Sequence, residues 1–72
     1  MSDNRYRVEA TNAGKGWLVT IRDPGGRSVF ERPCGGEAEA TTFASTVEQH
    51  IGWLSEPRFR RYYRLPEPAE PG

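Results

Sequence analysis

The chain has 72 residues and a mass of 8.1 kDa, which is enough for one small domain. A chain this short buries only about 60% of its surface on folding, and its mean hydropathy of −0.80 predicts a thin core. No apolar run approaches the roughly 18 residues that cross a bilayer, and the polar N-terminus leads into no apolar signal segment. These features exclude a multidomain enzyme, a membrane protein, a secreted disulfide scaffold and a repeat array.

Ten basic and ten acidic side chains balance over the whole chain but not locally. Residues 33–55 carry three acidic groups and no Lys or Arg, whereas residues 56–64 carry four arginines against Glu56. Nine of the ten basic residues are Arg, whose planar guanidinium binds carboxylates and phosphates in a bidentate manner. A neutral chain is not typical of nucleic-acid binders, because their affinity depends on the number of phosphates neutralised. The basic segments nevertheless leave that function open.

Three strand-like segments come first. They span residues 6–11, 17–22 and 27–32, the second being rich in β-branched and aromatic residues. Residues 12–16 and the segment Asp23-Pro24-Gly25-Gly26 have the composition of tight turns, and we expect the third strand to end at Pro33. Turns this short predict an antiparallel meander.

Pairing the strands across these turns gathers the apolar side chains on one face. We expect Val8 to pair with Val19 in the first hairpin, and Val19 to pair with Phe30 in the second. Side chains alternate between the two faces of a strand, so a slip of one residue would destroy this segregation. The apolar face then consists of Tyr6, Val8, Ala10, Trp17, Val19, Ile21 and Phe30.

A helix is expected to cover the apolar face. Gly35 and Gly36 give a flexible entry, and the carboxylates of Glu37 and Glu39 suit the positive N-terminal end of a helix dipole. Apolar residues then recur at helical spacing and form a stripe wide enough to pack on a three-stranded sheet. They are Ala40, Phe43, Ala44, Val47, Ile51 and Leu54.

Ser55 as N-cap and Pro57 in the first turn predict a second, short helix that runs through Arg64. Three prolines within residues 65–72 predict a disordered tail, and residues 1–4 are expected to be flexible. The expected fold class is α+β, a three-stranded antiparallel β-meander packed on one main α-helix, with a short second C-terminal helix. It forms a single domain over residues 5–64.

The sequence contains no catalytic or metal-binding motif. Cys34 is the only cysteine, so it cannot form an intramolecular disulfide, which fits a reducing cytoplasm. His50 is the only histidine, and one His with one Cys falls short of a zinc site. The carboxylates are not clustered as in a calcium loop. We therefore expect a cytoplasmic protein with no enzyme activity, no metal and no cofactor.

The first candidate surface is the aromatic and basic C-terminal segment. Trp53 falls off the apolar stripe of the expected helix, on the side shared with Thr42, Thr46 and His50. Trp, Tyr and Arg dominate the hot spots of protein interfaces, although in so small a domain these rings could instead extend the core. The predicted contacts to a protein partner are Trp53, Phe59, Arg60, Arg61, Tyr62 and Tyr63.

The alternative function is nucleic-acid binding through the open face of the sheet, since small sheets can enter the major groove and read bases with Arg. That face could equally be an ordinary solvated surface, with Glu9 and Glu31 paired to neighbouring arginines. The predicted contacts are Arg5, Arg7, Arg22 and Arg27, assisted by Arg58 and Arg64. A further option is a homodimer, or docking on another protein's sheet, through an unpaired edge strand.

The segment Tyr6-Arg7-Val8-Glu9-Ala10, a short turn, Gly16-Trp17-Leu18-Val19 and Asp23-Pro24-Gly25-Gly26 together resemble the start of HicB-like antitoxins. Glu37-Ala38-Glu39-Ala40 at the expected helix start extends this likeness, which covers residues 6–51. The strand-strand-strand-helix order is also similar to that of the arm-site-binding domains of tyrosine integrases. The resemblance implies an α+β fold and a binding role, such as a small regulator, inhibitor or antitoxin-like partner of another protein. It carries over no active residue.

Overall fold

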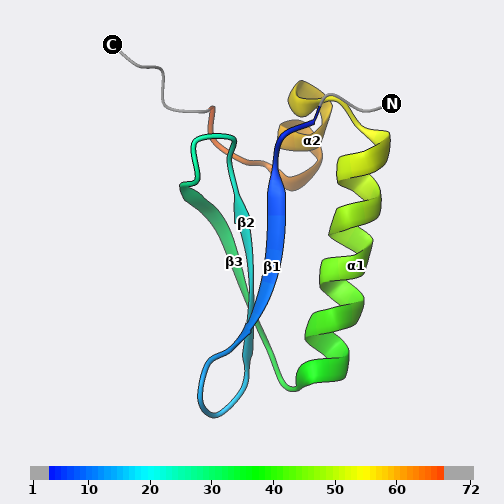
Figure 1. Ribbon diagram of the computed structural model, residues 1–72. Helices are drawn as coiled ribbons and strands as arrows, with labels where there is room; N and C mark the ends of the chain where they lie inside the picture. Colours follow the sequence, from blue (N-terminus) through cyan, green and yellow to red (C-terminus); the bar gives the residue numbers. More distant parts are fainter. Residues whose placement is uncertain (1–3, 68–72) are drawn as a thin grey trace.

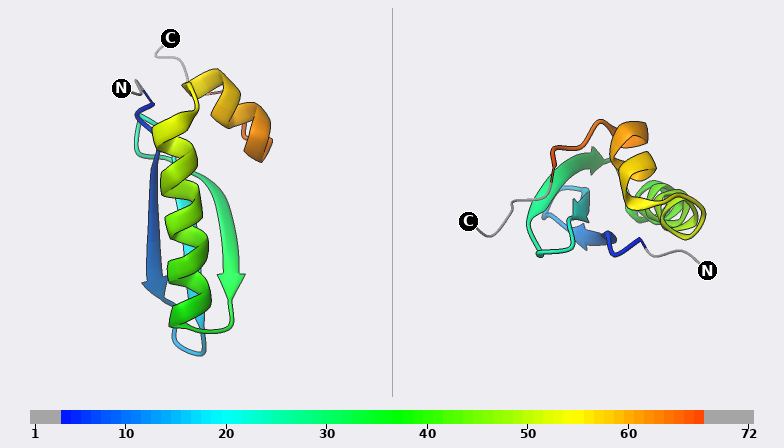
Figure 2. Two further views of the ribbon diagram at one scale, coloured as in Figure 1. Left: turned by 90° about the vertical axis from the view of Figure 1, so that its right-hand side faces the viewer. Right: turned by 90° about the horizontal axis from the view of Figure 1, so that it is seen from above.

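Three strands and two helices make up the computed structural model, which describes residues 4–67 (Figure 1). The elements are β1 (Arg7–Asn12), β2 (Trp17–Arg22), β3 (Ser28–Cys34), α1 (Glu37–Trp53) and α2 (Glu56–Tyr63). The strands form one antiparallel sheet in the order β1-β2-β3, and α1 lies across one of its faces (Figures 1 and 2). The predicted α+β class, with a meander under a main helix and a short second helix, is confirmed.

The β2–β3 turn is built around a buried carboxylate. Asp23 is only 2% exposed, and its Oδ1 accepts the backbone N–H groups of Gly25 at 3.0 Å and Arg27 at 2.9 Å. Gly26 adopts a φ of 92°, a conformation that glycine reaches without steric cost. The tight turn predicted at residues 23–26 is therefore present, and the Asp23 side chain fixes its shape.

The strand register differs from the prediction by two residues in both hairpins. Val8 pairs with Ile21, not Val19, and Ile21 takes the predicted place of Val19 opposite Phe30. In the second hairpin the Asp23 N–H donates to the Arg27 carbonyl, so Arg22 pairs with Ser28 and not with Arg27, and a bulge between Ile21 and Arg22 adds the second residue of the shift. A shift of two residues preserves the alternation of faces, so the predicted apolar face still meets α1.

β3 continues beyond the predicted end. Pro33 lies inside the strand opposite Leu18, and the strand ends at Cys34 opposite Trp17. Proline is tolerated there because β3 is an edge strand, whose outward N–H positions need no partner. The two-residue shift in register places Arg32 opposite Val19, on the face that α1 covers.

The core consists of two clusters between the sheet and the helices. The upper cluster contains Tyr6, Ile21, Val47 and Phe59, and the lower cluster contains Val19, Cys34 and Ala40. Burial of one large apolar side chain stabilises a fold by about 1.5–3 kcal/mol, so the four wholly buried side chains of this domain carry much of its stability. They are Phe59, Ile21, Val19 and Val47.

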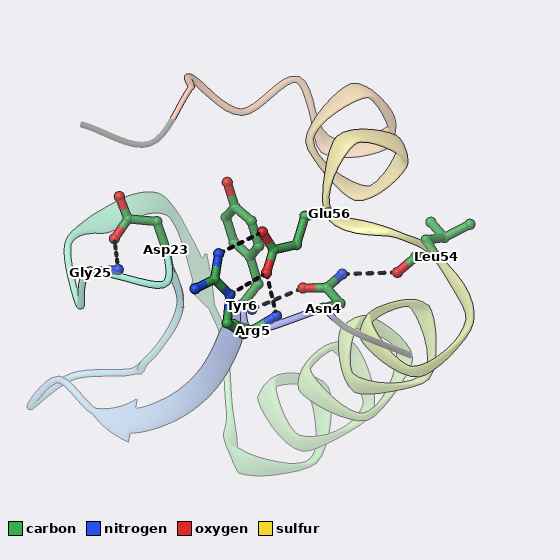
Figure 3. Close-up of polar contacts among 7 residues, drawn as sticks. All are labelled: Asn4, Arg5, Tyr6, Asp23, Gly25, Leu54 and Glu56. Atoms are coloured by element: carbon green, nitrogen blue, oxygen red, sulfur yellow. Dashed lines mark hydrogen bonds and ion pairs between the residues drawn. The ribbon is translucent and has the colours of Figure 1, made fainter. Parts of the chain in front are cut away.

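Residues at both ends of the described chain contact the rest of the domain. Asn4, assigned to a flexible terminus, donates its side-chain amide to the Leu54 carbonyl at 3.1 Å and accepts the Tyr6 N–H at 2.8 Å (Figure 3). Leu65, assigned to the disordered tail, packs against the upper cluster and donates its N–H to the Arg60 carbonyl. The remaining parts of these two predictions, at residues 1–3 and 68–72, lie outside the described residues.

Candidate protein-binding site

The start of α2 is tied to the segment that precedes β1. The Arg5 backbone N–H and Nε both donate to Glu56 Oε2, at 2.8 and 2.9 Å (Figure 3). These bonds lower the pKa of the Glu56 carboxyl, with the Arg5 side chain as the main cause. Ser55 is the N-cap residue as predicted, but its hydroxyl makes no capping bond. The Arg5–Glu56 pair therefore positions the first turn of α2.

One face of α2 is buried in the core. The Phe59 side chain has 0% exposure, and its ring lies 5.1 Å from that of Tyr6 and 4.9 Å from that of Tyr63. Phe59 was predicted to contact a partner, but it has no accessible surface to offer one. Its role is to hold α2 against the sheet.

The adjoining side of α2 meets the end of α1 in an aromatic patch, which we define as His50, Trp53, Tyr62 and Tyr63. His50 is at its centre, with ring centroids 6.4 Å from Trp53, 4.6 Å from Tyr62 and 5.7 Å from Tyr63. Trp53 is 74% exposed and Tyr62 is 62% exposed. The patch thus presents two large rings to solvent on either side of an ordered imidazole.

Tyr63 connects the aromatic patch to the core. Its ring makes an edge contact with Phe30 at 6.1 Å, and its hydroxyl lies 2.6 Å from Nδ1 of His50. Burial is the main cause that raises the pKa of the Tyr63 hydroxyl. The hydrogen bond between the hydroxyl and Nδ1 fixes the imidazole beside the exposed rings.

The two arginines predicted as contacts in α2 differ in accessibility. The Arg60 side chain is 15% exposed, and its Nε lies 3.5 Å from a carboxylate oxygen of Glu67. Arg60 also lies beside the buried Tyr6 hydroxyl, and this neighbour raises the Arg60 pKa. The Tyr6 hydroxyl itself makes no hydrogen bond of good geometry within residues 4–67. Arg61 is exposed. Of the two, Arg61 is the one free to contact a partner.

A groove adjoins α1 on its β3 side, and the sequence did not predict it. We define the α1–β3 groove by its lining residues, Arg32, Ala38, Glu39, Thr42, Phe43 and Thr46, which enclose about 440 Å³. The Arg32 guanidinium carbon lies 4.8 Å above the centre of the Phe43 ring. Alternation from Phe30 within the predicted strand already implied Arg32 on this face. The groove itself was not predicted, because it depends on how α1 passes beside β3.

The open face of the sheet carries mixed charge. Arg22 donates to Glu9 Oε1 at 2.8 Å and to the Gly26 carbonyl at 3.1 Å, and Arg5 is engaged with Glu56 at the edge of the domain. Glu9 and Glu31 flank Thr20 on the neighbouring strands. The other arginines predicted for nucleic-acid binding are exposed, namely Arg7, Arg27, Arg58 and Arg64.

Cys34 is buried in the lower cluster. Burial, and then the Glu39 carboxylate, raise the pKa of its thiol, so the sulfur is not activated as a nucleophile. Within residues 4–67, no three His, Cys, Asp or Glu side chains are grouped to hold a metal ion, and no helix is long and apolar enough to cross a membrane.

Comparisons with protein-family models, curated proteins and solved structures found no match for this chain. The geometry of its surfaces is therefore the basis for a functional proposal.

Proposed function

We propose that this chain is a non-catalytic protein-binding module, a small regulator or inhibitor that contacts its partner through the aromatic patch and Arg61. The observation that carries the proposal is the exposure of two large neighbouring rings, 74% for Trp53 and 62% for Tyr62. Exposed aromatic side chains that gather in one patch often mark an interaction site, and such rings are the usual anchors of protein interfaces.

The ordering of the patch supports this function. Both exposed rings contact His50, which is fixed by its hydrogen bond to Tyr63. Rings that are already held in place lose little conformational freedom when a partner binds, so more of the contact energy appears as affinity. The neighbouring Arg61 would supply hydrogen bonds at the rim of the interface.

Affinity capture tests the proposal. The tagged chain is incubated with a lysate of its host, with and without nuclease, beside a Trp53→Ala/Tyr62→Ala variant and a Thr41→Ala control. Thr41 is also exposed on α1, but it lies on the side of the helix away from the patch. We expect a nuclease-resistant protein that the control retains and the double variant loses. Equal capture by all three chains would contradict the proposal.

Nucleic-acid binding through the open face is the alternative, and the ion pairs on that face support it less. The Arg22 and Arg5 guanidiniums are already engaged by carboxylates. A salt series separates the two functions, because nucleic-acid affinity falls steeply between low and physiological salt while an aromatic-anchored interface changes little. Loss of nucleic-acid binding in an Arg7→Ala/Arg22→Ala variant, with partner binding intact, would favour the alternative.

A further inference from the structure

The α1–β3 groove lies where the helices leave the sheet uncovered. α1 runs over the middle of the sheet, and α2 covers only the upper part on the β3 side (Figure 2). The groove below α2 is lined by the Phe43 ring, the Arg32 guanidinium above it and the side chains of Thr42 and Thr46. An aromatic ring with a cation beside it is a surface on which a further aromatic ring can stack.

The groove and the exposed Trp53 lie on the same side of one helix. At about 100° per residue, positions 39, 42, 46 and 53 fall within a stripe about 60° wide along α1. Trp53 comes ten residues after Phe43, which is about 15 Å along the helix axis. α1 therefore carries a projecting ring at one end and a ring-lined groove towards the other.

The side chains between these two features permit another helix to approach. Thr42 and Thr46 are small and uncharged, and the Thr46 hydroxyl donates to the Thr42 carbonyl at 3.1 Å. Its hydrogen bond is thus satisfied within α1, so a partner helix would not leave it unpaired. Helices with small residues at the contact can pack with axes about 8–10 Å apart.

The geometry points to a second copy of this chain as the occupant of the α1–β3 groove. With the two α1 helices antiparallel and a twofold axis near residues 47–48, position 53 of each helix lies beside positions 42–43 of the other. Each Trp53 then enters the groove of the opposite copy, beside the stacked Arg32 and Phe43. A twofold arrangement closes both contacts at once. This inference rests on the proposed function, since it names the protein that the aromatic patch binds.

The charge distribution favours the same arrangement. Residues 33–55, which include α1, carry three carboxylates and no Lys or Arg, whereas residues 56–64, which include α2, have four arginines against one Glu. In an antiparallel pair, the end of α1 that carries Glu37 and Glu39 lies towards the end of the other copy's α1 from which its basic α2 follows. A parallel pair would place like charges together. The acidic and basic ends therefore select the antiparallel dimer.

Sedimentation equilibrium of the full chain over a concentration series tests this dimer. We expect a mass that approaches twice the 8.1 kDa of the chain. Thr46→Arg places a charge at the centre of the proposed contact and should leave a monomer, whereas Thr41→Arg, the same change on the far side of α1, should leave the dimer intact. Both positions are exposed and Arg is a better helix former than Thr, so both variants should fold. Trp53→Ala should weaken dimerisation roughly 30-fold or more.

Three outcomes would overturn the inference. A wild-type chain that remains monomeric on the order of 1 mM has no such dimer. A dimer that persists in Thr46→Arg uses another surface, such as a strand edge. Equal losses in Thr46→Arg and Thr41→Arg would reflect a general effect of added charge. A monomer that still captures a different protein through Trp53 refutes the dimer and leaves the proposed function standing. If neither self-association nor capture depends on Trp53, both proposals fail.

Discussion

Two groups of aromatic residues meet at α2, and the domain uses them in opposite ways. In the first group, Phe59 and Tyr6 are buried in the upper cluster at 0% and 2% exposure. In the second group, Trp53 and Tyr62 are exposed beside His50. Phe59 and Tyr62 are only three residues apart, so composition alone does not separate the ring that stabilises the fold from the ring available for binding. Because the two groups differ in burial, substitutions in the buried group should lower stability, whereas substitutions in the exposed group should weaken binding.

The largest expected effect comes from the buried group. Phe59→Ala removes a wholly buried ring and should lower the free energy of unfolding by about 3–5 kcal/mol, against a total of roughly 4–11 kcal/mol for a domain of this size. Tyr62→Ala should change it by no more than about 0.5 kcal/mol, apart from any effect on association. Urea denaturation of both variants, at a concentration where the chain is monomeric, measures the difference. Equal effects would show that the two sides of α2 are not distinct.

The ion pair between Arg5 and Glu56 positions the first turn of α2, the helix that carries residues of both groups. Hydrogen bonds from Arg5 lower the pKa of Glu56 in the folded chain, so the pair stabilises the fold above the unfolded pKa of Glu56. That contribution is lost as the pH falls through the lower folded pKa. Glu56→Gln should therefore lower the melting temperature at pH 7, and its difference from wild type should vanish in acid. A difference that stays constant from neutral to acidic pH would contradict a role for the carboxylate charge.

The core was largely predictable from the sequence because alternation along strands and helical spacing are local patterns. Val19, Ile21 and Val47 fell on the predicted apolar faces and are buried. The register was not predictable from the same patterns, since a shift of two residues leaves the faces unchanged and only the Asp23 hydrogen bonds and the bulge decide it. Asn4, likewise, became ordered through contacts made fifty residues away.

The site was predicted less well than the core. The helical position of Trp53, off the apolar stripe, agrees with its exposure of 74%. The burial of Phe59 was not evident, because it depends on how α2 is oriented against the sheet. The α1–β3 groove depends on the pairing of Arg32 with Val19 across strands, and on the path of α1. Surfaces formed by several elements carry no local sequence pattern.

Tyr63 contacts both the buried aromatic residues and the aromatic patch, so substitutions there test how the two groups are connected. Its ring packs on Phe30 and Phe59, whereas its hydroxyl is bonded to His50. Tyr63→Phe keeps the ring and removes the hydrogen bond, so it should lower the free energy of unfolding by about 0.5–1.5 kcal/mol and loosen the imidazole. Tyr62→Phe is the matched control and should have no measurable effect. Denaturation gives the energies, and NMR of the His50 ring protons reports its order. Unchanged His50 signals in Tyr63→Phe would show that the bond does not hold the patch.

The smallest expected effect is a gain in stability next to the patch. Gly52 is exposed near the end of α1, and a Cβ added there would meet nothing within 4 Å. Alanine fits a helix better than glycine, so Gly52→Ala should raise the free energy of unfolding by about 0.5–1 kcal/mol. Since residue 52 lies about 100° around α1 from Trp53 and outside the stripe that carries it, partner binding and self-association should stay as in wild type. Denaturation and sedimentation of the same sample check both. A variant that gained stability but lost association would mean that the contact surface extends around the end of α1, beyond the aromatic patch.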